Sequence, residues 1–161
     1  MGTTTRPARA AIAATALLLA LTGCSAAVPM TAAPDAAAVE CADVTVRLPA
    51  AIDELERRDT DAQATGAWGS PASVFLHCGV EQTGPSTLPC FTVRGIDWLR
   101  DDADAPTFVF TTYGREPAVR VTVDSTASSG TAALVAVANA VGTIPADRFC
   151  TAAEDVLGTE E

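Results

Sequence analysis

The sequence predicts an α+β domain: a small antiparallel or mixed sheet of about five strands, two main helices on one face, and stabilising disulfides. Three observations support this fold class. Residues 118–124 alternate valine with polar side chains, which is the period of a half-buried strand. Residues 128–142 repeat apolar side chains at helical spacing. Helical patterns that flank a run of strands, rather than alternate with them, indicate segregated helices.

The first predicted elements are a strand and a short helix. Residues 43–48 alternate apolar and polar side chains and predict the strand. Pro49 follows at a position that suits the first residue of a helix, and Ile52 and Leu55 provide a short apolar stripe. The polar residues 59–65 predict a loop.

The central part of the domain reads as strands. Residues 73–80 and 90–98 predict the second and third strands. Residues 107–113 and 118–124 predict the last two, and residues 114–117, which contain glycine and proline, are the turn between them. We therefore predict a β-hairpin over residues 107–124.

The second main helix has recognisable start and stop signals. Ser128 and Ser129 are N-cap candidates, and Leu134 lies on the apolar face. Gly142 ends the helix, and Pro145 prevents its continuation.

The C-terminal boundary follows from a small capping box. Thr151 and Glu154 have the spacing of such a box and predict a last helical turn that ends at Gly158. We place one folded domain at residues 41–158, a normal size for a single core, followed by a tail at residues 159–161.

Cysteines support both the fold and an oxidising compartment. Cys41, Cys78, Cys90 and Cys150 are an even number, and their spacing does not fit a structural zinc site. Three pairings are possible. We favour Cys78–Cys90, which closes a local loop, together with Cys41–Cys150, which joins the two ends of the domain.

The N-terminal region reads as an export signal at residues 1–23. Arg6 and Arg9 are its basic residues, and residues 10–21 are apolar except for Thr15. As a helix these twelve residues span about 18 Å at about 1.5 Å each, against a hydrocarbon core of about 30 Å. The segment is therefore too short for a comfortable membrane span.

The signal ends in Leu21-Thr22-Gly23-Cys24, which resembles a bacterial lipobox. The resemblance implies cleavage before Cys24 and transfer of a diacylglycerol to its thiol. Two or more acyl chains hold a protein stably at a membrane, whereas one chain does not. Residues 24–40 then form the lipidated cysteine and a flexible tether rich in alanine and proline, because they hold too few large apolar residues to fold.

The charge excludes several partners. Without Arg6 and Arg9 the chain has 8 basic and 20 acidic residues, a net charge of −12, and it has no lysine. Nucleic acid needs a basic footprint, and anionic head groups attract basic segments. We expect no nucleic-acid partner and attachment to the membrane through the acyl group alone.

Two motifs in the domain are distinctive. Gly95-Ile-Asp-Trp98 and Thr111-Thr-Tyr-Gly-Arg-Glu-Pro-Ala118, behind a lipobox and with this cysteine spacing, resemble an uncharacterised family of actinobacterial lipoproteins. The likeness extends from about Cys41 to Cys150. It supports the compartment and the domain boundaries and implies no activity.

The sequence contains no catalytic constellation. The one histidine, His77, directly precedes Cys78 in a predicted strand, so the two side chains point to opposite faces. There is no G-x-S-x-G nucleophile motif and no glycine-rich phosphate loop. We predict no catalytic residue, no cofactor and no metal site.

Acidic residues offer an alternative. Asp97, Asp101, Asp102 and Asp104 lie close together in the sequence, and crowded carboxylates raise one another's pKa or recruit a hard cation such as calcium. The group does not fit the EF-hand pattern. A solvated acidic loop is the simpler interpretation.

Aromatic residues near turns provide the candidate binding surface. Trp68, Trp98 and Tyr113 lie at segment ends, beside Asp97 and Arg115. Rigid rings next to a guanidinium are typical of binding patches. For Trp68 and Trp98 a core position is the stronger interpretation, and a contact surface is the alternative.

We therefore expect a membrane-anchored extracytoplasmic lipoprotein on the outer face of the cell membrane. It would be a non-enzymatic binding or interaction module of the bacterial envelope, whose partner is an envelope protein or a wall component. The alternatives are an enzyme of unfamiliar type or a weak calcium-binding protein that uses the aspartate cluster, and an inhibitor-like module with residues 83–89 as its rigid loop.

Overall fold

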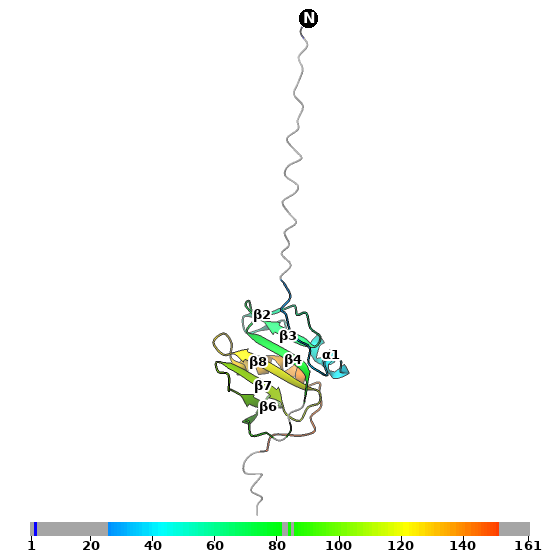
Figure 1. The fold of residues 1–161 in the computed structure, drawn as a ribbon, viewed down its shortest axis with the longest axis vertical. Helices are drawn as coiled ribbons and strands as arrows, with labels where there is room; N and C mark the ends of the chain where they lie inside the picture. Colours follow the sequence, from blue (N-terminus) through cyan, green and yellow to red (C-terminus); the bar gives the residue numbers. More distant parts are fainter. Residues whose placement is uncertain (1, 3–25, 82–83, 85, 152–161) are drawn as a thin grey trace, which may run out of the picture.

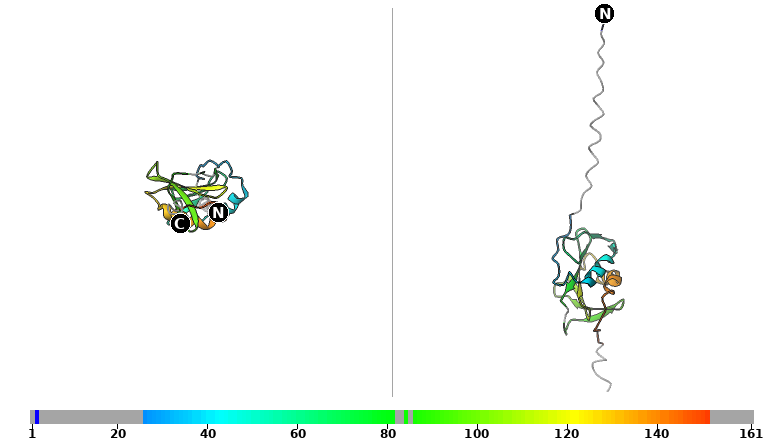
Figure 2. Two further views of the ribbon diagram at one scale, coloured as in Figure 1. Left: turned by 90° about the horizontal axis from the view of Figure 1, so that it is seen from below. Right: turned by 90° about the vertical axis from the view of Figure 1, so that its right-hand side faces the viewer.

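The computed structural model describes residues 2, 26–81, 84 and 86–151. Within this part eight strands form one antiparallel sheet in the order β1-β2-β3-β4-β8-β7-β6-β5 (Figure 1). Two helices lie side by side on one face of the sheet (Figure 2). The strands are β1 (Ala51–Ile52), β2 (Leu55–Arg58), β3 (Thr65–Trp68), β4 (Val74–Val80), β5 (Cys90–Val93), β6 (Ile96–Asp101), β7 (Thr107–Thr112) and β8 (Ala118–Asp124), and the helices are α1 (Val39–Val46) and α2 (Gly130–Val141).

The predicted five-stranded sheet is therefore wrong, and tight turns explain part of the difference. The segment 90–98 is two strands, because Arg94 and Gly95 take φ angles of 52° and 76° and reverse the chain. Positive φ at both central residues is the geometry of a two-residue hairpin turn.

The predicted helix after Pro49 is also a hairpin. Ala51 pairs with Glu56 and Ile52 with Leu55, and Asp53 makes the turn with a φ of 51°. Aspartate tolerates this left-handed conformation better than most residues. Ile52 and Leu55, which were expected to form the apolar stripe of a helix, are strand residues. Ile52 is buried and Leu55 is half-buried.

The predicted strand at 43–48 is the end of a helix. α1 buries Cys41 and Val44 and exposes Val46. Cys41, Val44 and Leu48 are three and four residues apart, which places them on one helical face. The alternation of residues 44, 46 and 48 is thus also compatible with a helix, and burial of Cys41 decides between the two.

The C-terminal half follows the prediction. β7 and β8 form the hairpin in a register that places Phe110 opposite Val121. α2 begins after Ser129, whose hydroxyl accepts a hydrogen bond from the Ala132 backbone N–H, and Gly142 is its C-cap residue. The predicted helical turn that ends at Gly158 and the tail at 159–161 lie outside the described residues.

Residues 26–40 are not a free tether. The Val28 backbone N–H donates to the Asp59 carbonyl at 2.8 Å, and the Asp35 N–H donates to the Gly79 carbonyl at 2.9 Å. Ala36 is buried, and α1 begins at residue 39. Backbone hydrogen bonds and small side chains fix this segment where composition predicted disorder. The folded domain therefore includes residues 26–40 and does not begin at residue 41.

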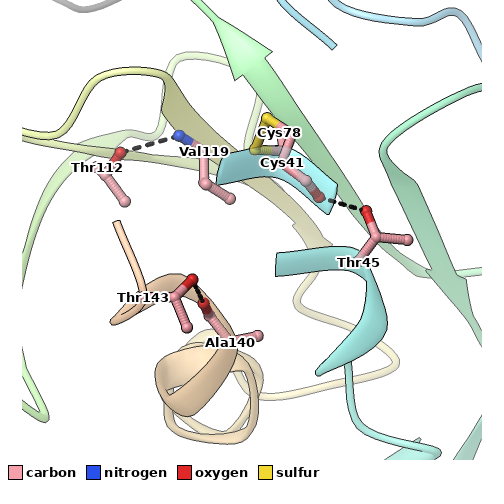
Figure 3. The surroundings of a disulfide bond; sticks show 7 residues. All are labelled: Cys41, Thr45, Cys78, Thr112, Val119, Ala140 and Thr143. Carbon is pink, nitrogen blue, oxygen red and sulfur yellow. Dashed lines mark hydrogen bonds between the residues drawn. A yellow bond between two sulfur atoms is a disulfide. The ribbon is translucent and has the colours of Figure 1, made fainter. Parts of the chain in front are cut away.

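The four domain cysteines form two disulfides, but the favoured pairing is wrong. The bonds are Cys41–Cys78 and Cys90–Cys150, with Cα–Cα distances of 5.5 and 5.7 Å. The first joins α1 to β4 and is completely buried (Figure 3). Cys78 and Cys90 do not pair with each other, because β4 lies in the middle of the sheet and β5 lies at its edge.

The core lies between the helices and the sheet. Trp68 and Trp98 are its largest side chains, and both are fully buried. The Trp68 indole N–H donates to the Pro49 carbonyl at 3.1 Å. No helix in the described part of the chain is long and apolar enough to cross a membrane.

Candidate functional site

The two motif segments meet under the C-terminal segment, which we define as residues 143–150. Asp97 in β6 is 8% exposed. One carboxylate oxygen of Asp97 accepts from the Thr92 hydroxyl at 2.6 Å, and the other accepts from the Cys150 backbone N–H at 2.7 Å. The Asp97 side chain therefore fixes the end of the C-terminal segment beside the Cys90–Cys150 disulfide.

Arg115 holds the other end of the same segment. Its side chain is 7% exposed and donates to the carbonyls of Ile144 and Gly95. The Gly114 carbonyl accepts from the Asp147 backbone N–H at 2.7 Å. Gly114 has a φ of 70°, and a Cβ there would overlap the Arg148 carbonyl, so only glycine permits this close approach.

The electrostatics agree with a structural role for this cluster. Burial lowers the pKa of Arg115, and the nearby negative charge of Asp97 opposes that shift. Both carboxylate oxygens of Asp97 and both terminal nitrogens of Arg115 have hydrogen-bond partners, whereas Arg115 Nε has none among the described residues. Asp97 and Arg115 therefore belong to the interior of the domain, not to the predicted binding patch.

The aromatic residues of that patch are separated as well. Trp68 and Trp98 have no exposed surface, so neither ring can contact a partner of the folded domain. Tyr113 is half-buried, and the Arg148 guanidinium lies 5.8 Å from its ring centroid. The predicted exposed patch of three aromatic rings is therefore wrong. Two of the three rings fill the core between the sheet and the helices.

The aspartate cluster does not converge either. Asp97 points into the interior, whereas an Asp101 oxygen accepts from the Ala103 backbone N–H at 3.0 Å. Asp102 pairs with Arg100 at 3.1 Å. Across residues 26–81, 84 and 86–151 no group of three or more His, Cys, Asp and Glu side chains could hold a metal ion.

His77 lies in β4, where burial, and to a lesser extent the charge of Arg120, lowers its pKa below 6.5. The unfolded chain therefore binds the proton more readily, and the folded state loses stability as the pH falls through about 6.5. We expect the free energy of unfolding to fall more between pH 7.5 and 5.5 in the wild type than in His77→Gln. Urea unfolding at both pH values measures this, and equal losses would contradict it.

The described surface does contain an open cleft that the sequence did not indicate. It lies between the N-terminus of α2 and the end of the sheet formed by β5, β6 and β7, and its volume is about 390 Å³. Its apolar lining consists of Phe91, Phe108, Phe110 and Leu134. Its polar lining consists of Arg100, Ser125, Ser128, Ser129 and Thr131, with Gly130 between them.

The cleft lies where the cover that α2 provides ends. α2 contacts β8 and also both edge strands, β5 and β1. The first turn of α2 and side chains of β5, β6 and β7 line the cleft, whereas Trp98 in β6 is completely buried.

The candidate binding residues predicted from the sequence do not include the phenylalanines that line the cleft, and Ser128 and Ser129 were predicted only as helix caps. Phe108 and Phe110 alternate along one strand, so they share a face. The alternation of Phe108 and Phe110 in the sequence predicts an apolar face of β7. The position at which α2 begins decides which part of that face is covered. Residues 83 and 85 of the predicted inhibitor-like loop lie outside the described residues.

Comparison with known proteins gives one result. No curated protein and no solved structure matches the chain. A family model matches residues 8–149, which include both motifs, three of the four disulfide cysteines and every residue that lines the cleft. The chain therefore belongs to the family described as "Protein of unknown function (DUF3515)".

Proposed function

We propose that this protein is a lipid-anchored lipoprotein on the outer face of the cell membrane and acts there as a non-enzymatic binding module. The observation that carries the proposal is the sequence Leu21-Thr22-Gly23-Cys24 behind a basic and apolar segment. Two disulfides support it, because such bonds persist in oxidising compartments outside the cytoplasm.

The packed N-terminal segment alters how such an anchor would hold the domain. Arg58 donates to the Ala26 carbonyl at 3.0 Å, so residue 26 is fixed on the domain surface. Two peptide units between residues 24 and 26 reach at most about 8 Å. A lipidated Cys24 therefore holds the domain directly against the bilayer surface, not at the end of a long tether.

The side chains favour binding over chemistry. The carboxylate of Asp97 is engaged by two hydrogen bonds, and the lone histidine lies in a strand away from it. The open cleft beside α2 offers apolar rings with a few polar groups, the combination that small-molecule sites use. We assign the binding function to this cleft.

Substitution of Cys24 tests the anchor. In cells supplied with an alkyne-labelled fatty acid, we expect the wild-type protein to incorporate the label and Cys24→Ala to incorporate none. Ser25→Ala is the matched control, because it changes the neighbouring residue and keeps the thiol. Equal labelling of Cys24→Ala and the wild type would contradict the proposal. In-gel fluorescence after immunoprecipitation measures the difference.

A further inference from the structure

We propose that the cleft beside α2 binds a single-chain anionic amphiphile, with its carboxylate at the α2 N-terminus and Arg100 and its alkyl chain along the phenylalanines. This inference rests on the assignment of the binding function to the cleft. It names the ligand class that the lining residues recognise.

The floor of the cleft is apolar and continuous with the core. The rings of Phe91 and Phe110 pack edge to face, with centroids 6.1 Å apart. Phe91 and Phe108 are only partly buried, so each keeps apolar surface in contact with solvent. An alkyl chain that covers these rings removes that surface from water, which is the main favourable term in apolar binding.

The floor reaches the first turn of α2 because residue 130 is glycine. A Cβ on Gly130 would lie 2.8 Å from Cζ of Phe110, closer than side-chain carbons approach one another. The apolar floor and the helix N-terminus therefore adjoin. A ligand that fits here has its polar group directly beside its apolar chain.

The polar end of the cleft favours a negative charge. α2 has twelve residues, and its first turn contains no acidic side chain that would offset the positive end of the helix. In the part of the chain that the structure describes, the backbone N–H groups of Gly130 and Thr131 have no hydrogen-bond acceptor. Such N–H groups are typical donors to bound anions.

Two side chains point to the same ligand. Ser128 is 9% exposed, and its hydroxyl oxygen is buried without a partner among the described residues. A buried hydroxyl without a hydrogen bond is costly, and a ligand oxygen would satisfy it. Arg100 is directly opposite Phe110 in the β6–β7 register, so its side chain lies on the face of the cleft.

Asp102 forms an ion pair with Arg100, so a bound carboxylate would compete with Asp102 for the Arg100 guanidinium. Their ion pair is 3.1 Å long, and both side chains are about half exposed. Exposed pairs of this kind are weak, so a bound carboxylate can replace Asp102. The full chain carries a net charge of −10, which repels anions at long range. The preference must therefore come from the local groups.

Binding of decanoate to the chain from residue 24 onward, carrying Cys24→Ala so that no acyl group competes, tests the inference. Isothermal titration is expected to show saturable binding of decanoate at millimolar concentration or below. Decanol has the same chain without the charge, and acetate has the charge without the chain. We expect each to bind at least about tenfold more weakly, the loss of one charge-assisted hydrogen bond or of the apolar contact.

Three variants separate the polar groups from general effects. Arg100→Gln is expected to weaken decanoate binding about tenfold, and Asp102→Asn to strengthen it a few-fold. Thr131→Glu places a negative charge in the first turn of α2, which favours the helix and repels the ligand. It should abolish binding without lowering the midpoint of thermal unfolding. Arg120→Gln removes an exposed positive charge elsewhere and should change nothing.

Several results would overturn the inference. They are equal affinity for decanoate and decanol, unchanged binding in Thr131→Glu, or no saturable binding of decanoate. Absence of fatty-acid labelling at Cys24 with intact decanoate binding would remove the anchor and leave the cleft. Labelling of Cys24 without decanoate binding would remove the ligand class and leave the anchor.

Discussion

Replacing Cys41 and Cys78 together by alanine is expected to lower the free energy of unfolding by about 4 kcal/mol under oxidising conditions. The bond closes a loop of 37 residues, and the entropy that it removes from the unfolded chain corresponds to that value. Both cysteines are also fully buried, between α1 and β4. Since small domains have only about 5–15 kcal/mol in total, this loss brings the protein close to unfolding at physiological temperature.

Urea unfolding of the double variant measures this loss. The matched comparison is the double variant Cys90→Ala with Cys150→Ala, in which one cysteine is exposed and the other half-buried. Its 60-residue separation predicts a similar entropic loss. Only this second variant should also expose residues 143–150 to proteolysis. A loss below about 1 kcal/mol in the Cys41 and Cys78 variant would contradict the prediction, as would a disulfide map with other pairs.

Arg115→Leu is expected to lower the free energy of unfolding by about 3 kcal/mol. The substitution leaves the carbonyls of Ile144 and Gly95 without their donor and leaves the Asp97 carboxylate buried without its nearby cation. Uncompensated buried groups cost about 1–3 kcal/mol each, and more when they are charged. Urea unfolding measures the effect.

Two controls separate this role from a general effect of charge. Arg120→Leu removes an exposed arginine from the neighbouring strand and should change stability by less than about 0.5 kcal/mol. Arg115→Leu combined with Asp97→Asn should be less destabilised than the sum of the two single variants, since the groups interact. A loss in Arg115→Leu no larger than in Arg120→Leu would show that Arg115 does not hold the C-terminal segment, and full additivity would show that Arg115 and Asp97 do not interact.

The two sequence motifs thus stabilise the packing of the C-terminal segment. The segments 95–98 and 111–118 together hold residues 143–150 on the sheet through Asp97, Gly114 and Arg115. A glycine, a buried carboxylate and a buried arginine are needed for this packing. The two motifs therefore have a structural role and do not identify a ligand.

The sequence was a good guide where one local signal acted alone. The hairpin of β7 and β8 has both the alternation and the turn, and α2 has its serine cap and terminal glycine. It failed where two periods fitted the same residues, as at Val44, Val46 and Leu48 in and after α1. It also failed at residues 51–58, because Asp53-Glu54 lacks the usual signature of a tight turn.

The candidate site depended on features that no local pattern contains. Trp68 and Trp98 stand beside turns in the sequence, but neighbouring strands and both helices bury them completely. The cysteine pairing depends on which strand lies at the sheet edge, and the cleft depends on where α2 ends above β7. These are properties of the assembled sheet, so they follow from topology and not from spacing.

Intact-mass spectrometry of the protein extracted from its own membranes reads the state of Cys24 without any substitution. We expect the mature chain to begin at Cys24, with a diacylglyceryl group on its sulfur and the other four cysteines oxidised. A chain that begins at any other residue, or a Cys24 thiol without a lipid, would contradict the proposal that this domain works as a lipid-anchored module on the outer face of the membrane.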